Sequence, residues 1–326
     1  LAVCLMTTGC NSKKEAVLTS GIDLANLDTT AMPGTSFYQY ACGGWIESHP
    51  LTDEYSRFGT FDMLRENSRE QLKALIAELA AKKDNAPGSA AQKVGDLYNI
   101  AMDSVKLNQE GVAPIKAELA AIDALKDKGE IYAYIAESQK KGIRPYFTMF
   151  VSADDMNSSM NIVQTYQGGI GMGQRDYYLE NDEQTKNIRN KYQEHIAKMF
   201  QLAGYDEATA QKAVKAVMNI ETRLAQSARS QVELRDPHAN YNKKTLEELQ
   251  KEYPSFAWDV FFSTAGLNNL KEVNIGQPDA LKEVNAIIDT VSLEDQILYL
   301  QWNLINSAAN YLSDDFIAQD FDFYGR

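Results

Sequence analysis

Apolar residues recur along most of this chain with the spacing of an amphipathic helix. Leu72, Leu75, Ile76 and Leu79 occupy positions i, i+3, i+4 and i+7, which lie on one helix face. A turn-forming run at residues 86–89 ends this helix and caps the next. The same pattern predicts a helix through Val94, Leu97, Tyr98 and Ala101, one through Ile115, Leu119 and Ile122 that ends at Gly129, and later ones at about 182–203, 206–228, 245–252, 278–290 and 293–312.

One segment departs from this helical period. Residues 146–151 are rich in aromatic and β-branched side chains, and residues 160–166 follow after a turn-forming cluster at 153–159. Two such runs around a turn are typical of a β-hairpin. No repeat with a period of about 20–50 residues is apparent, which argues against a helical solenoid. The sequence therefore predicts a mainly α fold, a multi-helix domain with a small β-hairpin.

Composition and charge exclude some classes of function. A chain of 326 residues with 44% hydrophobic content can bury a sizeable core. Its formal net charge of -13 repels a phosphate backbone, and no basic run interleaved with aromatic residues offsets that charge. We therefore expect no nucleic-acid partner. No apolar run reaches the length of about 18 residues that a membrane-spanning helix needs.

The first residues resemble the end of a bacterial lipoprotein signal. Small residues precede Cys10, and a polar stretch follows it. This pattern predicts a signal-peptide remnant at residues 1–9, acylation of Cys10, and a lipid-anchored flexible tether at 10–31. The expected location is the bacterial cell envelope, with the protein facing the periplasm or the exterior. A fragment of an ordinary signal peptide, or a helix end with a chance cysteine, is the alternative.

The sequence shows no recognisable set of catalytic residues. A hydrolytic zinc site commonly uses two histidines one helical turn apart with a glutamate between them. The histidines, His49, His195 and His238, are too far apart for this motif, and we expect solvated or helix-surface side chains. The glycine-rich run at 168–173 follows a hairpin and lacks the βαβ context of a dinucleotide site. The sequence thus predicts no metal ligand and no catalytic residue in this chain.

Several segments resemble a known family and indicate a function that the candidate catalytic residues do not reveal. Residues 37–45 (FYQYACGGW) and 56–65 (SRFGTFDMLR) resemble the opening of a zinc metallopeptidase of the neprilysin and endothelin-converting-enzyme family. Further similar segments follow in the same order, at residues 151–158, 166–178, 241–246 with 256–258, 299–302 and 321–325. Two positions depart from the pattern, because Gly173 stands where the family usually has proline and Lys244 where methionine is common.

The resemblance implies a role for residues 32–326 as the mostly helical, access-restricting N-terminal domain of a two-lobed metallopeptidase. In that family the zinc ligands and the catalytic glutamate lie downstream, so this chain alone is expected to be inactive. The implied partners are short peptide substrates, the C-terminal catalytic domain and, through the lipid anchor, a membrane. In animal members the cysteine of the ACGGW motif forms a disulfide; without a partner here, Cys42 is expected to be a small buried residue.

Three residues carry the implied binding role. The family's SRxGxFDxLR segment lines the subsite two residues beyond the scissile bond, and its positions match Arg57, Asp62 and Arg65. An arginine can hold a free carboxylate bidentately, and Asp62 lies where it can orient Arg65. Without the resemblance, an exposed helix salt bridge would be the default interpretation. The alternative function for the whole chain is a non-catalytic helical surface lipoprotein that binds peptides or glycans.

Overall fold

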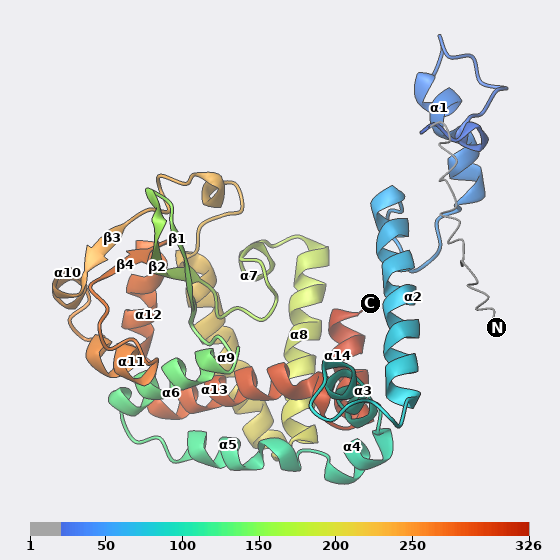
Figure 1. Ribbon diagram of the computed structural model, residues 1–326. Helices are drawn as coiled ribbons and strands as arrows, with labels where there is room; N and C mark the ends of the chain where they lie inside the picture. Colours follow the sequence, from blue (N-terminus) through green and yellow to red (C-terminus); the bar gives the residue numbers. More distant parts are fainter. Residues whose placement is uncertain (1–20, 326) are drawn as a thin grey trace, which may run out of the picture. The chain divides into compact units, whose positions relative to one another are not determined.

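The computed structural model describes residues 21–325, which form two compact units (Figure 1). One unit extends to Tyr98 and the other begins at Asn99. Both are mainly helical, and strands occur only in the second of them among the described residues. Cys10 and the signal-peptide remnant lie outside the described residues, as does the first part of the predicted tether. None of the described helices combines the length and the apolar character needed to span a bilayer.

In the first unit, η1 (Leu24–Asn26) packs closely against a glycine of α1 (Phe37–Ser48). The unit also contains α2 (Thr60–Ala81) and most of α3 (Ala90–Ala101). A Cβ on Gly44 would lie 2.3 Å from the carbonyl oxygen of Ala25, so η1 approaches α1 where no side chain fits. Gln39 also donates a hydrogen bond to Asp28 at 3.1 Å. Part of the segment predicted as a tether, residues 24–28, is therefore packed against α1.

The second unit contains most of the predicted helices, with bounds within a few residues of those expected. The prediction that Gly129 ends the third helix was wrong, because α5 already stops at Asp123. Gly129 lies in the first turn of the next helix. Asp127 caps that helix by accepting a hydrogen bond from the Glu130 N–H at 2.9 Å. The helices are α4 (Ser104–Glu110), α5 (Ala113–Asp123), α6 (Lys128–Lys140), α7 (Asp176–Leu179), α8 (Glu183–Leu202), α9 (Glu207–Ser227), α10 (Leu246–Glu252), α11 (Trp258–Thr264), α12 (Pro278–Thr290), α13 (Leu293–Ala308) and α14 (Asp314–Tyr324), with short 3-10 turns η2 (Glu233–Arg235) and η3 (Ala309–Tyr311).

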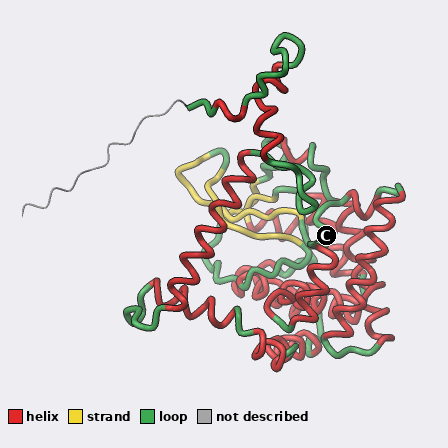
Figure 2. The backbone as a smooth tube through the Cα atoms, turned by 90° about the vertical axis from the view of Figure 1, so that its right-hand side faces the viewer, coloured by secondary structure: helices red, strands yellow, loops and turns green. Residues whose placement is uncertain are grey.

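A small sheet accompanies these helices and confirms the predicted hairpin (Figure 2). The strands β1 (Phe147–Asp154) and β2 (Asn157–Gln167) pair antiparallel, and the turn between them is shorter than expected. β4 (Glu272–Ile275) then adds parallel to β2, and β3 (Lys243–Thr245) adds antiparallel to β4. The resulting order β1-β2-β4-β3 leaves β1 at one edge.

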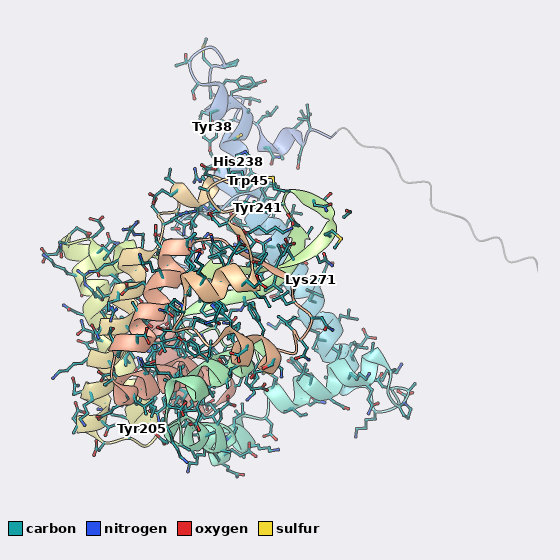
Figure 3. All side chains as sticks on the ribbon, turned by 90° about the vertical axis from the view of Figure 1, so that its left-hand side faces the viewer. Tyr38, Trp45, Tyr205, His238, Tyr241 and Lys271 are labelled. Carbon is teal, nitrogen blue, oxygen red and sulfur yellow. The ribbon has the colours of Figure 1, made fainter. Side chains whose placement is uncertain are left out.

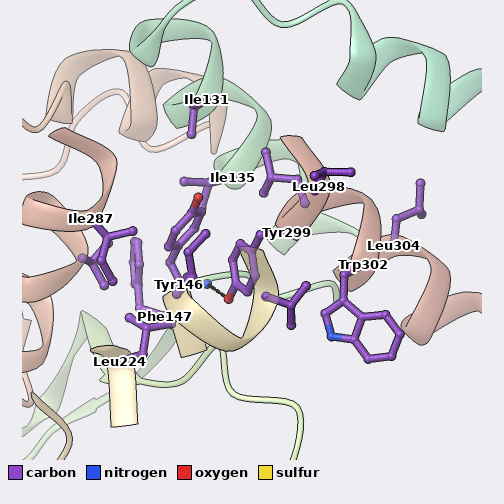
Figure 4. Close-up of a cluster of buried hydrophobic side chains, with 14 of the residues drawn as sticks. Ile131, Ile135, Tyr146, Phe147, Leu224, Ile287, Leu298, Tyr299, Trp302 and Leu304 are labelled. Atoms are coloured by element: carbon purple, nitrogen blue, oxygen red, sulfur yellow. Dashed lines mark hydrogen bonds between the residues drawn. The ribbon is translucent and has the colours of Figure 1, made fainter. Parts of the chain in front are cut away.

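The core of the second unit forms where α9 packs against α8, α12 and α13. Tyr299 on α13 connects two other segments to this core. Its hydroxyl accepts from the Tyr146 N–H at 3.0 Å (Figure 4), and it donates to the Gly169 carbonyl at 2.7 Å. A Cβ on Gly171 would lie 1.9 Å from the hydroxyl oxygen of Tyr192. The glycine-rich run therefore lets the backbone pass within contact distance of buried tyrosine side chains.

Candidate functional site

The site predicted from the sequence lies at the start of α2. Gly59 is the N-cap residue and has an extended backbone, and as a glycine it has no side chain with which to cap the helix. Asp62, at the third helical position, makes the reciprocal contact of a capping box, since its Oδ2 accepts from the Gly59 N–H at 2.9 Å. An acidic group in the first turn also complements the helix dipole. The position of Asp62 is thus fixed by the local structure of the helix.

Asp62 also orients Arg65. Its second oxygen, Oδ1, accepts from Nη2 of Arg65 at 2.7 Å, across a spacing of three residues. The Arg65 side chain remains 51% exposed, whereas that of Asp62 is only 17% exposed. One edge of the guanidinium is therefore held, and the group still faces solvent. Arginine presents a planar set of donors, so this arrangement is suited to a carboxylate ligand.

Arg57 lies in the loop before α2 and is exposed. No ion pair with another residue in 21–325 engages its guanidinium. The loop around it is held by aromatic contacts, since Phe58 stacks with Trp45 at 6.3 Å between ring centroids and packs edge-on against Tyr55 at 5.0 Å. Trp45 belongs to the first motif and Phe58 to the second, so the two family motifs meet at this site.

The histidines of the described residues do not form a metal centre. The His49 ring stacks on the Trp45 ring at 4.5 Å between centroids, and its Nδ1 lies 2.9 Å from the Trp45 carbonyl oxygen. His238 is exposed, as expected. Residues 21–325 contain no group of three histidine, cysteine, aspartate or glutamate side chains placed to hold a metal ion. This donor set does not fit a hydrolytic zinc site.

His195 differs from the expected solvated histidine. It is buried on α8, stacks on Phe323 at 5.0 Å and meets the edge of Trp302 at 5.5 Å. Burial lowers the pKa of its imidazole below the ordinary value. The expectation failed because His195 lies on the inner face of α8, against α13 and α14, and the neighbouring residues in the sequence gave no sign of that packing.

Cys42 was expected to be a small buried residue. It has a free thiol and is half-buried rather than fully buried.

The two motifs that meet at Trp45 and Phe58 belong to a longer pattern. The sequence pattern that describes the N-terminal part of Peptidase family M13 matches residues 33–326. The chain belongs to peptidase family M13. Members of this family act on peptide substrates, and the mainly helical domain with its small sheet corresponds to one half of M13 peptidase structures.

Curated relatives support the same assignment. Endothelin-converting enzyme 1 of Homo sapiens is 29% identical over 329 residues, an alignment that covers 96% of this chain and 41% of that protein. The endothelin-converting enzyme homolog of Locusta migratoria is 30% identical over 314 residues, covering 90% of this chain and 42% of that protein. The chain thus spans about two fifths of the length of these relatives.

Solved structures match the fold. The zinc metalloprotease Zmp1 of Mycobacterium tuberculosis, in complex with an inhibitor, has a TM-score of 0.85 and 31% identity, over 94% of this chain and 47% of that chain. PepO from Lactobacillus rhamnosis has a TM-score of 0.69 at 18% identity, over 86% of this chain and 44% of that chain, which shows the shared fold. M13 membership therefore relates this chain to zinc metallopeptidases, while its described residues contain no metal-binding group.

Proposed function

We propose that this chain is the N-terminal region of an M13 zinc endopeptidase that cleaves short peptides. The observation that supports this most strongly is the family match over residues 33–326. We assign the zinc ligands and the catalytic glutamate to the part of the M13 length that this chain does not cover. The mostly helical domain contributes selection of substrates by size. In this proposal the chain needs that remaining part before it can turn over substrate.

The chain's own contribution to binding is a subsite for the peptide's C-terminal carboxylate. Arg65, held by Asp62, supplies one guanidinium, and the exposed Arg57 supplies the second. Charge-assisted hydrogen bonds to a carboxylate each contribute about 1.5–3 kcal/mol. Peptides that end two residues past the cleaved bond should therefore bind best.

The test compares peptides with a free and an amidated C-terminus in the full-length enzyme that carries this chain. In Arg65→Met we expect KM for the free peptide to rise about 10- to 100-fold, because one such bond is lost. The amidated peptide should change little, since it offers no carboxylate. Arg69→Met is the matched control, because Arg69 is an exposed arginine one turn further along α2 that pairs with Glu66. Equal losses for both peptides in Arg57→Met and Arg65→Met would make these arginines structural.

The proposed location is the cell envelope, through a lipid anchor on Cys10. The motif around Cys10 in the sequence supports it. In the full-length precursor, Cys10→Ala should abolish acylation and release the protein to the soluble fraction, because each buried methylene of an acyl chain contributes about 0.8 kcal/mol to membrane binding. A variant that stays membrane-bound after a high-salt wash would refute the anchor.

A further inference from the structure

β1 is an edge strand whose outer side is only partly occupied. Because strand backbones alternate, residues 148, 150 and 152 face β2, while residues 147, 149, 151 and 153 direct their N–H and C=O groups away from the sheet. Gln139 on α6 fills the first of these outward positions. Its side-chain amide donates to the Phe147 carbonyl at 3.1 Å and accepts from the Met149 N–H at 2.7 Å.

This contact shows that the edge accepts the donor and acceptor pair of an added strand. The amide of Gln139 carries one N–H donor and one C=O acceptor at the spacing with which a neighbouring backbone would bind. Beyond it the ladder is open. Within residues 21–325, no hydrogen bond engages the Met149 carbonyl, the Val151 N–H or the Val151 carbonyl. A register irregularity between Ala153 and Asp154 then ends the strand.

The open part of the edge has little of the usual protection against strand addition, apart from the irregularity at its end. Residues 148–153 read TMFVSA and contain no proline and no charged residue. Proteins commonly use such residues, or a covering element, to keep exposed edges from pairing. Val151 is 59% exposed and Phe150 is 39% exposed, so apolar side chains accompany the open backbone groups. An edge with these features is a template for one more strand.

A hollow lies over the sheet face that Val151 occupies, on the β2 side of β1 and away from its open edge. Its volume is about 630 Å³, and Val151, Met160, Leu267 and Leu270 supply apolar walls. Lys243 stands at its rim, held by Glu272 at 2.8 Å and Asp154 at 3.3 Å. Lys271, which is labelled in Figure 3, also lines the hollow. An added strand would lie on the other side of β1, so its side chains would meet the exposed Phe150 and Val151 side chains rather than this hollow.

We infer that the outer edge of β1, from Met149 to Ala153, binds a short extended peptide by strand addition, with apolar side chains of that peptide against Phe150 and Val151. Main-chain hydrogen bonds would give affinity, and contact with Phe150 and Val151 would favour apolar side chains in the peptide. The site lies apart in sequence from Arg57 and Arg65, and it goes beyond the function proposed above.

The length of the open edge favours a peptide over a second copy of the chain. It is bounded by Gln139 at one end and by the irregularity at Asp154 at the other, so about five residues are available. A stable dimer buries on the order of 1,200 Å² or more, which a strip of this length does not provide by itself. A short peptide needs only these few backbone groups, and peptides are what M13 peptidases act on.

The test uses the 326-residue chain and a labelled probe peptide, acetyl-Ser-Val-Thr-Leu-Thr-Ser-amide. We expect saturable binding by fluorescence anisotropy and slowed hydrogen exchange at the Val151 amide. N-methylation of alternate peptide amides should abolish binding in one register and leave it within about twofold in the other, because only alternate N–H groups face β1. Since the probe has no free carboxylate, Arg65→Met should bind it as the wild type does. This separates the inference from the carboxylate subsite.

Val151→Pro removes the outward N–H and leaves the bonds between β1 and β2 in place, so the dissociation constant should rise at least tenfold. Val151→Thr keeps that N–H and is the matched control, with little change expected. Far-ultraviolet circular dichroism confirms the fold of each variant, and the N-methylated probes test the wild type if Val151→Pro is unfolded. Equal binding of both N-methylated series, or no protection at Val151, would overturn the inference. So would a concentration-dependent dimer that Val151→Pro dissociates, because the occupant would then be a second copy.

Discussion

The Tyr192 hydroxyl donates a hydrogen bond to the Glu221 carboxylate at 2.9 Å, and both side chains are buried. Tyr178 donates to the same oxygen at 2.5 Å, and Nε1 of Trp302 donates to the Tyr192 oxygen at 3.0 Å. These hydrogen bonds favour the charged carboxylate, but removal from water outweighs them and raises the pKa of Glu221 to about 7. This one acidic group on α9 thus connects α7, α8 and α13.

The raised pKa of Glu221 makes the stability of the second unit depend on pH. Between the ordinary pKa of 4.5 and about 7, the folded chain keeps a proton that the unfolded chain releases. The free energy of unfolding should therefore fall as pH rises through this window, by up to about 3 kcal/mol, and then level off. Glu221→Gln keeps an acceptor but cannot ionise, so its urea-unfolding free energy should vary less between pH 5 and pH 8.

His195 makes the free energy of unfolding depend on pH in the opposite direction, so its variant serves as the control. Burial lowers its pKa, so the unfolded chain takes up a proton first as the pH falls, and stability decreases below about pH 6.5. His195→Gln should remove this decrease and leave the Glu221 effect in place. If wild type and Glu221→Gln show the same pH profile, then Glu221 is ionised in the folded protein and the burial argument is wrong.

The glycine-rich run should tolerate substitution at some positions and not at others. At Gly171 a new Cβ would meet the Tyr192 hydroxyl oxygen at 1.9 Å, and at Gly169 it would meet the Tyr146 backbone at 2.6 Å with φ at +72°. We expect Gly169→Ala and Gly171→Ala to lower the free energy of unfolding by about 2–4 kcal/mol. Gly173 has φ at +78° but nothing within 4 Å, so Gly173→Ala should cost only about 1 kcal/mol. Denaturant unfolding of the three variants measures the difference, and equal losses would contradict it.

The strongest sequence patterns predicted the fold well. Helices α8, α9 and α12 have long apolar faces, and their bounds lie within two residues of those expected. The hairpin was also found, because a turn-forming cluster separates two runs rich in aromatic and β-branched residues. In contrast, α6 was missed since Gly129 was taken as an end, although Ile131 and Ile135 begin a buried face two residues later. The parallel pairing of β2 with β4 joins segments more than 100 residues apart, and no local pattern encodes it.

The candidate site was predictable only in part. The spacing of Asp62 and Arg65 predicted their ion pair, because residues three apart are neighbours on a helix. The stacking of Trp45 on Phe58 joins separate segments and depends on how the intervening loop folds. The open edge of β1 could not be predicted from the sequence either, because the contact that Gln139 makes with it depends on how α6 packs.

Metal content gives a separate prediction. After dialysis, the 326-residue chain should retain well below one equivalent of zinc, because a hydrolytic site needs about three protein ligands at tetrahedral positions. Within residues 21–325 His195 is enclosed by aromatic rings and His49 is stacked on Trp45. Elemental analysis by mass spectrometry provides the measurement. One tightly held equivalent of zinc, removed by a chelator together with peptidase activity, would show that this chain does contain a zinc site.

The last prediction concerns the double task of Asp62, which caps Gly59 with one oxygen and holds Arg65 with the other. Asp62→Asn keeps one acceptor and removes the charge, so the Arg65 guanidinium becomes free to rotate. In the full-length enzyme, KM for a peptide with a free carboxylate should rise about three- to tenfold, with kcat nearly unchanged, since the contact lies away from the reacting carbonyl. The effect should disappear when Arg65 is already methionine, because in the proposed subsite Asp62 acts on the carboxylate only through Arg65. Additive losses in the double variant, or equal losses for the amidated peptide, would mean that Asp62 matters only as a helix cap.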